Sequence, residues 1–400
     1  MQDVIVVGAG PGGATAAYFL AQQGVEVLLL DKAAFPRDKT CGDGLLPRAL
    51  DVFRDMGLLS DLEHMGARLE RVTAFASGGR ELSVPLPTRS GWPGYALVVP
   101  RYRLDHALLE RARSVGAQFG GNAHVVDVRP AEKHSTVLAD VAGRRVEYHA
   151  RIVIIATGAS TALLKTIGLL KTPPRTALAA RAYYDNVAGL TDALELHFAD
   201  IRLPGYAWVF PTSPTSANIG AGCFPGAWGK TAASPKHSFD AFRARNDRTR
   251  RMLRDARIAG NVKGFPLRVD FATAPTHGEG VLLVGEAAGL VNPTSGDGID
   301  LAAETGRIAA EHIPRLLKSG GRSAGALSGY GAELRHRYQA VFLGLKQMRD
   351  LYMNPWLLNR AFDAALKDDE LRNLIMEVAL GQAYPAQLLT FERTLQILRG

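Results

Sequence analysis

One short segment of the chain combines residue types that can move protons. The segment PRDKTCGDGLLPRAL, residues 36–50, places Cys41 near two basic side chains, Arg37 and Lys39, and one acidic side chain, Asp43. A thiol can act as an acid, and neighbouring cations lower its pKa when they lie close. Cys41 is therefore a candidate acid or acid relay, and Asp43 a candidate proton relay. Two simpler roles stay open: Cys41 as a small buried residue, and Asp43 as a turn residue between two glycines.

A nucleotide-binding pattern precedes this segment. The apolar run Asp3–Val7 predicts a buried parallel strand, and the glycine-rich GAGPGG then opens a helical pattern over residues 14–23. A second apolar run, VEVLLLDK, predicts a strand that ends at Asp31. Strand, glycine turn, helix, strand and terminal acid in this order are typical of a dinucleotide-binding unit.

Each glycine of this pattern, and its terminal acid, has a physical role. Gly8 permits the tight turn, Gly10 lets a pyrophosphate approach the backbone, and Gly13 lets the helix pack on the strand. The helix start offers free N–H groups to the phosphates, and Asp31 is placed for a ribose hydroxyl. The pattern alone does not separate NAD from FAD, and a glycine turn without a ligand remains the alternative.

Three later segments resemble, in the same order, the FAD-contacting segments of the large flavoprotein group that includes the aromatic hydroxylases. They are VVPRYRLDHALLERA, IVIIATGAS and GVLLVGEAAGLVNPTSGDGIDLAAETG, which begin at residues 98, 152 and 280. The resemblance implies FAD as the cofactor. The cofactor-binding residues expected from the whole pattern are Gly8, Gly10, Pro11, Gly13, Asp31, Lys32, Lys39, Cys41, Gly42, Arg101, Ala156, Thr157, Gly158, Gly285, Glu286, Pro293, Gly296, Gly298 and Ile299.

For Arg101 and Glu286 the assignment as a cofactor-binding residue has an open question, and for Ile299 it has a separate physical reason. Arg101 matches the phosphate-contacting arginine of the group, although it could instead cap a helix start. Glu286 stands where the group usually has Asp, so its contact geometry is uncertain while its polarity is kept. A glycine turn leads into a long helix that begins at Ile299, and such a helix start can stabilise negative charge on a reduced flavin.

The segment around Cys41 also carries a narrower resemblance. FPRDKTCGDGL, GYAWVFP at residues 205–211 and NPWLLNRAF in the C-terminal part resemble the geranylgeranyl reductase family, flavoenzymes that saturate isoprenoid double bonds. The resemblance implies that Cys41 sits beside the flavin. It also implies that the aromatic strand lines the channel of an apolar, polyprenyl-type substrate. The expected substrate-binding residues are Tyr206, Trp208, Phe210 and Pro211.

Some of this can be read from the residues alone. Tyr206, Trp208 and Phe210 stand two apart, so their rings share one strand face. Without the resemblance, an aromatic strand is more often part of a core than of a cavity. Cys223 is expected to be inert on a strand, and neither a zinc nor an iron motif is found in the sequence.

The expected reaction is reduction of an alkene. In the family, hydride comes from reduced FAD and an acid protonates the other carbon; NAD(P)H or another reduced carrier supplies the electrons, since a second dinucleotide pattern is not seen. One alternative is a monooxygenase or halogenase of the same superfamily in specialised metabolism. The halogenases usually have the motif W-x-W-x-I-P, whereas this chain has Tyr206 and Phe210 at the outer positions. A prenyl-binding escort protein without flavin chemistry is a third reading.

The order of these elements predicts an α/β fold. A Rossmann-like FAD-binding domain of the glutathione-reductase type carries an inserted antiparallel or mixed β-sheet substrate domain, followed by a helical C-terminal region. The substrate domain is expected from short alternating strands, RVTAFA, RELSVPL, TALAARAYYDNV, ALELHFA, YAWVFPTS and SANIGAGCF. The predicted boundaries are 1–65, 98–165 and 270–321 for the FAD-binding domain, 66–97 and 166–269 for the substrate domain, and 322–400 for the helical region.

The composition of the chain limits the partners and the compartment that we expect. The 400 residues carry a formal charge of +8, but the basic residues are scattered, and the densest run, residues 243–257, is expected to be a solvated helix face. Neither nucleic-acid-binding modules nor an apolar window of about 18 residues is found, so we expect no nucleic-acid partner and no membrane span. Two cysteines suit a reducing compartment such as the cytoplasm. Peripheral membrane contact and the oligomeric state stay open.

Overall fold

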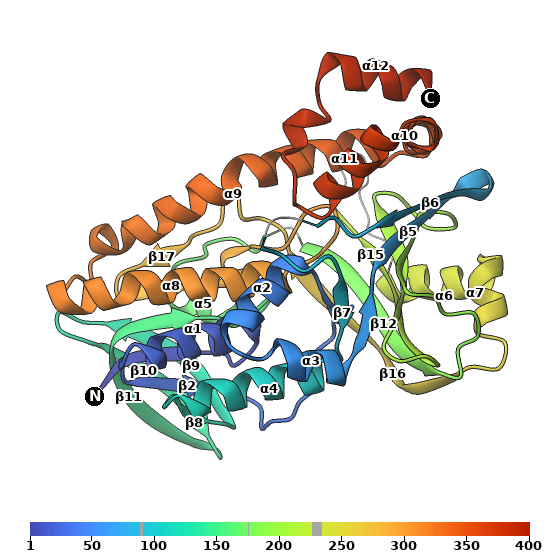
Figure 1. The fold of residues 1–400 in the computed structure, drawn as a ribbon. Helices are drawn as coiled ribbons and strands as arrows, with labels where there is room; N and C mark the ends of the chain where they lie inside the picture. Colours follow the sequence, from blue (N-terminus) through green and yellow to red (C-terminus); the bar gives the residue numbers. More distant parts are fainter. Residues whose placement is uncertain (89–90, 175, 226–233) are drawn as a thin grey trace.

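The computed structural model of the protein describes residues 1–88, 91–174, 176–225 and 234–400. In these residues the chain forms two large sheets that lie side by side, together with a small three-stranded sheet. The C-terminal helices run along one side of both large sheets (Figure 1). In the described residues, none of the helices is both long enough and apolar enough to cross a membrane.

The first large sheet carries the nucleotide-binding unit at its centre. Its strands are β1 (Gln2–Val7), β2 (Val27–Leu30), β8 (Gln118–Gly120), β9 (Ala123–Pro130), β10 (Ser135–Val141), β11 (Arg144–Ile155), β17 (His277–Gly278) and β18 (Val281–Leu283). β1 pairs in parallel with β2 and β11, and β18 joins β11 in parallel. The short apolar runs of β1, β2 and β18 suit strands that are buried on both faces. The predicted strand, helix, strand order of this unit is confirmed.

Helices cover the first sheet. They are α1 (Pro11–Gln22), α2 (Pro47–Asp55), α3 (Leu59–Met65), α4 (Arg101–Ser114), α5 (Ala162–Thr166) and α8 (Ile299–Ser319). α1 and α8 approach closely, because a Cβ on Gly306 would lie only 2.5 Å from the carbonyl oxygen of Gly12. This contact fixes the start of α8 beside the glycine turn.

The second large sheet is mixed, as the sequence predicted. Its strands are β5 (Arg71–Ala76), β6 (Arg80–Pro85), β12 (Thr176–Asp185), β13 (Ala193–His197), β14 (Gly205–Pro211), β15 (Ser216–Cys223) and β16 (Arg257–Arg268). Their order is β16-β12-β15-β14-β13-β5-β6, and β13 and β5 form the one parallel pair along it. Two short helices cover the outer face: α6 (Pro235–Arg245) buries Phe239 and Phe242 there, and α7 (Asp247–Met252) buries Met252. The inner face is left for a cavity.

The small sheet was not predicted. It consists of β3 (Gly44–Leu45), β7 (Ala96–Val98) and β4 (Ala67–Leu69), with β7 in the middle. β3 has two residues and β4 has three, which is too short to show an alternating pattern. The sheet pins the loop of Cys41, because β3 follows that loop directly.

The basic run of residues 243–257 is split between two helices and a strand start, so it does not form one helix face. Most of its arginines are exposed, as expected. Arg248 differs, since it forms an ion pair with the buried carboxylate of Glu195. Arg243 is also partly buried, because it pairs with Asp240 and donates a hydrogen bond to the hydroxyl group of Tyr184.

The C-terminal region is helical, with α9 (Ala324–Tyr352), α10 (Pro355–Lys367), α11 (Asp369–Ala379) and α12 (Phe391–Arg399). α10 begins at Pro355 and α11 follows Asp368, both residue types that favour helix starts, and the Asp368 side chain accepts a hydrogen bond from the N–H of Leu371. The segment YPAQLLTFERTLQIL, residues 384–398, reads as one helix in the sequence, but the structure divides it. Pro385–Gln387 form a short 3-10 turn, and Thr390 caps a separate helix, α12.

This helical region closes one end of the second sheet. Phe362 of α10 packs in an apolar cluster with Leu82, and Asp363 forms an ion pair of 2.7 Å with Arg80 of β6. Met376 of α11 joins the apolar cluster of Val72 on β5. The C-terminal helices therefore pack against the second sheet and form part of the wall around its inner face.

Candidate active site

A cavity of about 800 Å³ lies between the two large sheets. The carboxyl ends of β1 and β2 and the start of α8 border it on one side, and β12 and β14 border it on the other. The predicted site residues that line it are Gly8, Gly10, Pro11, Asp31, Lys32, Lys39, Cys41, Gly42, Asp43, Arg101, Ala156, Thr157, Gly158, Tyr206, Trp208, Phe210, Glu286, Gly296, Gly298 and Ile299. The predicted residues that do not line it are Gly13, Pro211, Gly285 and Pro293.

Two glycines close the strand side of the turn after β1. Gly8 has a φ of 105°, and a Cβ there would lie 2.4 Å from the carbonyl oxygen of Ala156. A Cβ on Gly13 would lie 1.8 Å from the carbonyl oxygen of Gly8. A side chain at either position would therefore separate β1 from its neighbours, so Gly13 acts by packing, as its role in the pattern predicts.

The third glycine of the turn faces open space. A Cβ on Gly10 would have the Nη2 atoms of Arg37 and Arg101 as its nearest neighbours, each at 3.8 Å. α1 begins at Pro11, and in the described residues its first turn has no side-chain cap, so its N–H groups are available. A helix start and two guanidinium groups around an open glycine suit the two negative charges of a pyrophosphate.

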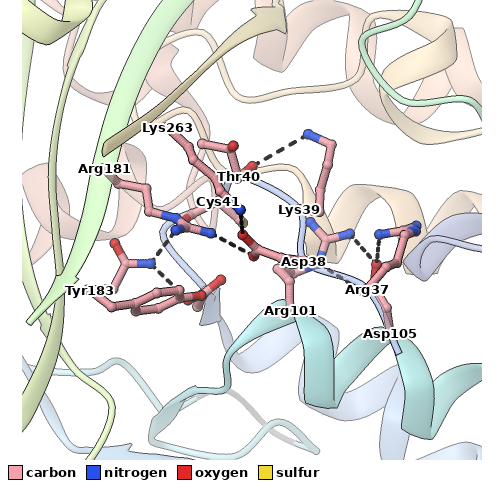
Figure 2. Close-up of polar contacts among 12 residues, drawn as sticks. Arg37, Asp38, Lys39, Thr40, Cys41, Arg101, Asp105, Arg181, Tyr183 and Lys263 are labelled. Atoms are coloured by element: carbon pink, nitrogen blue, oxygen red, sulfur yellow. Dashed lines mark hydrogen bonds and ion pairs between the residues drawn. The ribbon is translucent and has the colours of Figure 1, made fainter. Parts of the chain in front are cut away.

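A buried carboxylate holds the two arginines in place (Figure 2). Arg101, the first residue of α4, donates from Nε and Nη2 to Asp105 at 2.6 and 2.8 Å, and Arg37 Nη1 donates to Asp105 at 2.8 Å. Burial disfavours the charge on Arg101, but the Asp105 carboxylate outweighs it and raises the pKa of the guanidinium. Arg101 therefore contributes a fixed cation to the cavity wall.

Asp31 ends β2 at the cavity edge, with its carboxylate already held by backbone groups. Oδ2 accepts from the N–H of Ala9 at 2.8 Å, and Oδ1 accepts from the N–H of Ala33 at 2.9 Å. Each oxygen keeps a lone pair for a second donor. A ribose contact thus stays a prediction, with Lys32 lining the cavity beside it.

Glu286 and Lys39 bring opposite charges to the far end of the nucleotide groove. Glu286 Oε1 accepts from the N–H of Arg268 at 3.0 Å, and burial raises the pKa of the carboxyl group. Burial lowers the pKa of Lys39 to about 8, against the attraction of Glu286. Lys39 Nζ lies 3.4 Å from the ring centre of Phe265. A cation held over a ring in a buried wall would gain from an anionic ligand.

Cys41 is partly buried in the loop between β2 and β3. Burial raises the pKa of the thiol, and the charges of Arg101 and Lys39 oppose this shift without cancelling it. The charges of Arg101 and Lys39 therefore do not produce a thiolate. The group is a neutral S–H at neutral pH, which suits an acid rather than a nucleophile.

Asp43 is a turn residue with a buried carboxyl group, and its proposed proton-relay role stays a prediction. Its φ of 67° is the left-handed conformation of a turn residue. Its carboxyl group is fully buried and accepts at Oδ2 from Tyr183 Oη at 2.5 Å and from Asn218 Nδ2 at 2.8 Å. Burial raises the pKa of this group to about 6, although both hydrogen bonds lower it. The group can therefore gain and lose a proton near neutral pH.

The aromatic residues of β14 form a continuous wall across the cavity. The ring centres of Tyr206 and Trp208 are 5.9 Å apart, and those of Trp208 and Phe210 are 6.2 Å apart. Gly220 of β15 makes room for the wall, since a Cβ there would lie 2.2 Å from Trp208. The loop of Cys41 faces the wall, because a Cβ on Gly42 would lie 3.3 Å from the Phe210 ring.

Several residues of the site carried no recognisable signal as catalytic groups in the sequence. Tyr183 and Asn218 stand in strands that read only as alternating, although a lone amide in the apolar SANIGAG could have marked Asn218. Asp105 could have been found from its i, i+4 spacing after Arg101.

Cys223 lines the cavity, with its Sγ 3.4 Å from Ser238 Oγ. Across the described ranges, groups of three or more His, Cys, Asp or Glu placed to hold a metal ion are absent.

Comparison with known proteins identifies the cofactor. Residues 1–343 match the family model described as an FAD binding domain. Among solved structures, a geranylgeranyl bacteriochlorophyll reductase-like protein from Thermoplasma acidophilum superposes with a TM-score of 0.77 at 22% identity, covering 99% of this chain and 95% of its own. A flavin-dependent brominase superposes with a TM-score of 0.74 at 19% identity over 100% of this chain and 99% of its own. The fold and the nucleotide groove define an FAD-dependent oxidoreductase.

Curated relatives narrow the class. Menaquinone reductase of Mycobacterium tuberculosis is 36% identical over 94% of this chain and 90% of its own length. Digeranylgeranylglycerophospholipid reductase 1 of Methanopyrus kandleri is 31% identical over 87% of this chain and 90% of its own length. The chain belongs to the geranylgeranyl reductase family of FAD-dependent oxidoreductases.

Proposed function

We propose that the protein reduces carbon–carbon double bonds in the isoprenoid tail of a polyprenyl lipid or quinone. The observation that carries this proposal is the placement of Cys41 and Asp43 opposite the aromatic wall in one cavity. The relatives named as menaquinone and digeranylgeranylglycerophospholipid reductases support the substrate class. FAD, when bound and reduced, would supply a hydride to one carbon of the double bond.

The nucleotide groove is the proposed FAD site. Its fit rests on the open face of Gly10, the free N-terminus of α1 and the paired cations Arg37 and Arg101. We assign the pyrophosphate to this cradle and the ribose to Asp31. The start of α8, at Ile299, is proposed to face the flavin ring. The boundaries predicted for the FAD-binding domain and the substrate domain remain part of this proposal, in which the first domain holds the cofactor and the second holds the substrate.

The apolar end of the cavity is the proposed tail site. Beyond the aromatic wall it is lined by aliphatic side chains from the second sheet, from the start of α2 and from the C-terminal region: Val72, Leu194, Leu196, Leu46 and Leu380. A long isoprenoid chain would bury its surface there and gain binding energy that positions the reacting carbons. The rings of Tyr206, Trp208 and Phe210 can also stabilise positive charge that develops on a carbon during protonation.

The neutral thiol of Cys41 is the proposed acid that faces the substrate. It is protonated at neutral pH, and Arg101 lies close enough to stabilise the thiolate that remains after proton loss. Its carbonyl oxygen is fixed by Asn218, so the loop cannot move away from the wall without breaking that hydrogen bond. These features support a fixed proton donor in a partly dry site.

Two partners are also proposed. A nicotinamide nucleotide or another reduced carrier supplies electrons by transient binding. The C-terminal region makes peripheral contact with a membrane on the cytoplasmic side, because it exposes large apolar side chains: Leu343, Leu351, Trp356, Leu366, Tyr384, Phe391 and Leu398. Vesicle flotation of the wild type and of Phe391→Asp tests this membrane contact. If both proteins float equally, Phe391 does not contribute to the contact.

Product analysis tests the proposed reaction. The FAD-loaded protein is reduced with dithionite without oxygen and incubated with menaquinone or with geranylgeranyl diphosphate. After any quinol has been re-oxidised in air, mass spectrometry should detect a gain of two hydrogens in the isoprenoid tail for each double bond reduced. An unchanged substrate without oxygen, together with an oxygenated or halogenated product when oxygen and halide are present, would replace this proposal with the monooxygenase or halogenase alternative.

A further inference from the structure

Two side chains hold the carboxyl group of Asp43 in place. Tyr183 Oη of β12 and Asn218 Nδ2 of β15 both donate to Oδ2, at 2.5 and 2.8 Å. The other oxygen, Oδ1, is buried, and no described group gives it a hydrogen bond. One oxygen of the carboxyl group is thus fixed, and the other is the atom that can carry a proton.

Asn218 also fixes what surrounds this carboxyl group. Its Nδ2 donates to the carbonyl oxygen of Cys41 at 2.8 Å, and its Oδ1 accepts from Trp208 Nε1 at 3.0 Å. One amide therefore sets the positions of the acid loop, the buried carboxyl group and the aromatic wall. A loss of this amide would leave buried donors and acceptors unpaired on all three.

Tyr183 connects the carboxyl group with the surface. Its side chain is partly exposed, and its ring lies under the guanidinium of Arg181, 4.2 Å from ring centre to Cζ. Arg181 Nη2 donates to Asp38 at 2.7 Å, and Asp38 also pairs with the exposed Lys263, as Figure 2 shows. Tyr183 thus contacts the buried Asp43 through its hydroxyl group and the ion pairs of Arg181, Asp38 and Lys263 through its ring.

We propose that Tyr183 and Asn218 are positioning residues that keep Asp43 as the proton reserve of the site, which returns a proton to Cys41 after each reduction. This inference rests on the proposed function. In each turnover the π bond breaks, and one C–H bond forms from hydride of the reduced flavin. The second C–H bond forms from the proton of the Cys41 S–H group, whose electron pair stays on sulfur. The O–H proton of Asp43 then restores the thiol, and solvent reloads the carboxylate through the Tyr183 hydroxyl.

The acid strengths of the two groups suit this order. Burial raises the pKa of Asp43 to about 6 and also raises that of the Cys41 thiol above its ordinary value. Transfer of a proton from the carboxyl group to the thiolate is therefore downhill. The reverse arrangement, with Cys41 reloading Asp43, would run uphill.

The charged and titratable groups around Asp43 decide the direction of the pH effect. Tyr183 and Asn218 lower its pKa by hydrogen bonding, and Arg181 of β12 and Arg101 of α4 lower it by charge. Removal of either hydrogen bond must raise the pKa of Asp43, so the reserve stays filled to higher pH. The reserve empties as pH rises through that pKa.

Infrared titration of the FAD-loaded protein without substrate tests the arrangement. The carbonyl stretch of the protonated carboxyl group is isolated by subtracting the spectrum of Asp43→Asn. It should titrate with a midpoint near pH 6 in the wild type, and the midpoint should rise by about one unit in Tyr183→Phe. Tyr184→Phe is the matched control, because Tyr184 is the next residue of β12 and its hydroxyl bonds Arg243 instead.

The pH profile of turnover gives the second readout. The upper limb of kcat should move to higher pH with the carboxyl midpoint in Tyr183→Phe and in Asn218→Leu, and it should stay in place in Tyr184→Phe. An unchanged midpoint in Tyr183→Phe, or a carboxyl band that is absent at pH 5, would overturn the inference. If the band titrates and shifts as stated while polyprenyl compounds are not reduced, the proposed function fails and the carboxyl arrangement stands.

Discussion

The side-chain amide of Asn218 donates a hydrogen bond of 2.8 Å to the carbonyl oxygen of Cys41. This bond joins β15 of the second sheet to the loop that leaves the first sheet. The wall that would hold the substrate and the loop that would face the flavin are therefore positioned against each other by one side chain. A shift of either part by about 1 Å can cost a hundredfold in rate, so a direct link has catalytic value.

Gly10→Ala should weaken FAD binding without unfolding the protein. The new methyl group would point into open space, 3.8 Å from two guanidinium nitrogens, where the pyrophosphate is proposed to lie. We expect a loss of affinity of about tenfold or more, measured by flavin fluorescence on titration of the FAD-free protein. Gly329→Ala on α9 is the control, because a Cβ there meets no atom within 4 Å. Equal affinity in both variants would contradict the assigned cradle.

Lys39→Met should stabilise the FAD-free protein and weaken its hold on FAD. Burial lowers the pKa of Lys39 to about 8, so below that pH the folded state carries a disfavoured charge. The penalty shrinks as pH rises from 8 toward the unfolded value. The free energy of unfolding of the variant should exceed that of the wild type at pH 7 by on the order of 2 kcal/mol. Urea unfolding at pH 7 and pH 10 measures this, and the difference should be smaller at pH 10; a difference that grows with pH would contradict the sign.

Trp208→Phe should destabilise the protein by about 1–3 kcal/mol, because the buried Asn218 Oδ1 loses its donor. The ring is largely kept, so the apolar wall should survive. Urea unfolding measures the loss, and Trp356→Phe is the control, since that indole is 58% exposed. Equal losses in the two variants would show that the hydrogen bond contributes nothing.

Cys41→Ser should slow the re-oxidation of the reduced protein by a polyprenyl substrate by about a hundredfold, because a hydroxyl group is a far weaker acid than a thiol. Reduction of the flavin by its electron donor should be unchanged. Cys223→Ser is the matched control: Cys223 also lines the cavity, but Ser238 is the polar side chain beside it. Equal rates in both variants would remove Cys41 from the proton path.

The sequence predicted the nucleotide unit because its glycines and terminal acid have fixed spacing along one short segment. The aromatic wall was predictable for the same reason, since Tyr206, Trp208 and Phe210 share one strand. Contacts between distant segments were not predictable. The bonds from Asn218 and Tyr183 to Asp43 span 175 and 140 residues, and they depend on which strands become neighbours in the second sheet.

Burial also changed expectations that were based on neighbouring charges. Arg37 and Lys39 next to Cys41 suggested a lowered thiol pKa, but desolvation outweighs the charges of Arg101 and Lys39 and raises it. Arg37 turns instead toward Asp105. A side chain's direction follows from its tertiary partners, and sequence spacing over a loop does not determine it.

Anaerobic re-oxidation of the fully reduced protein tests the central claim most directly. The reduced FAD-loaded protein is mixed without oxygen with geranylgeranyl diphosphate or menaquinone, and the flavin absorbance is followed. We predict that the oxidised flavin spectrum returns with one of the two, and that the isoprenoid tail gains two hydrogens for each flavin re-oxidised. A spectrum that stays reduced with both compounds, and returns only when oxygen is admitted, would contradict reduction of isoprenoid double bonds.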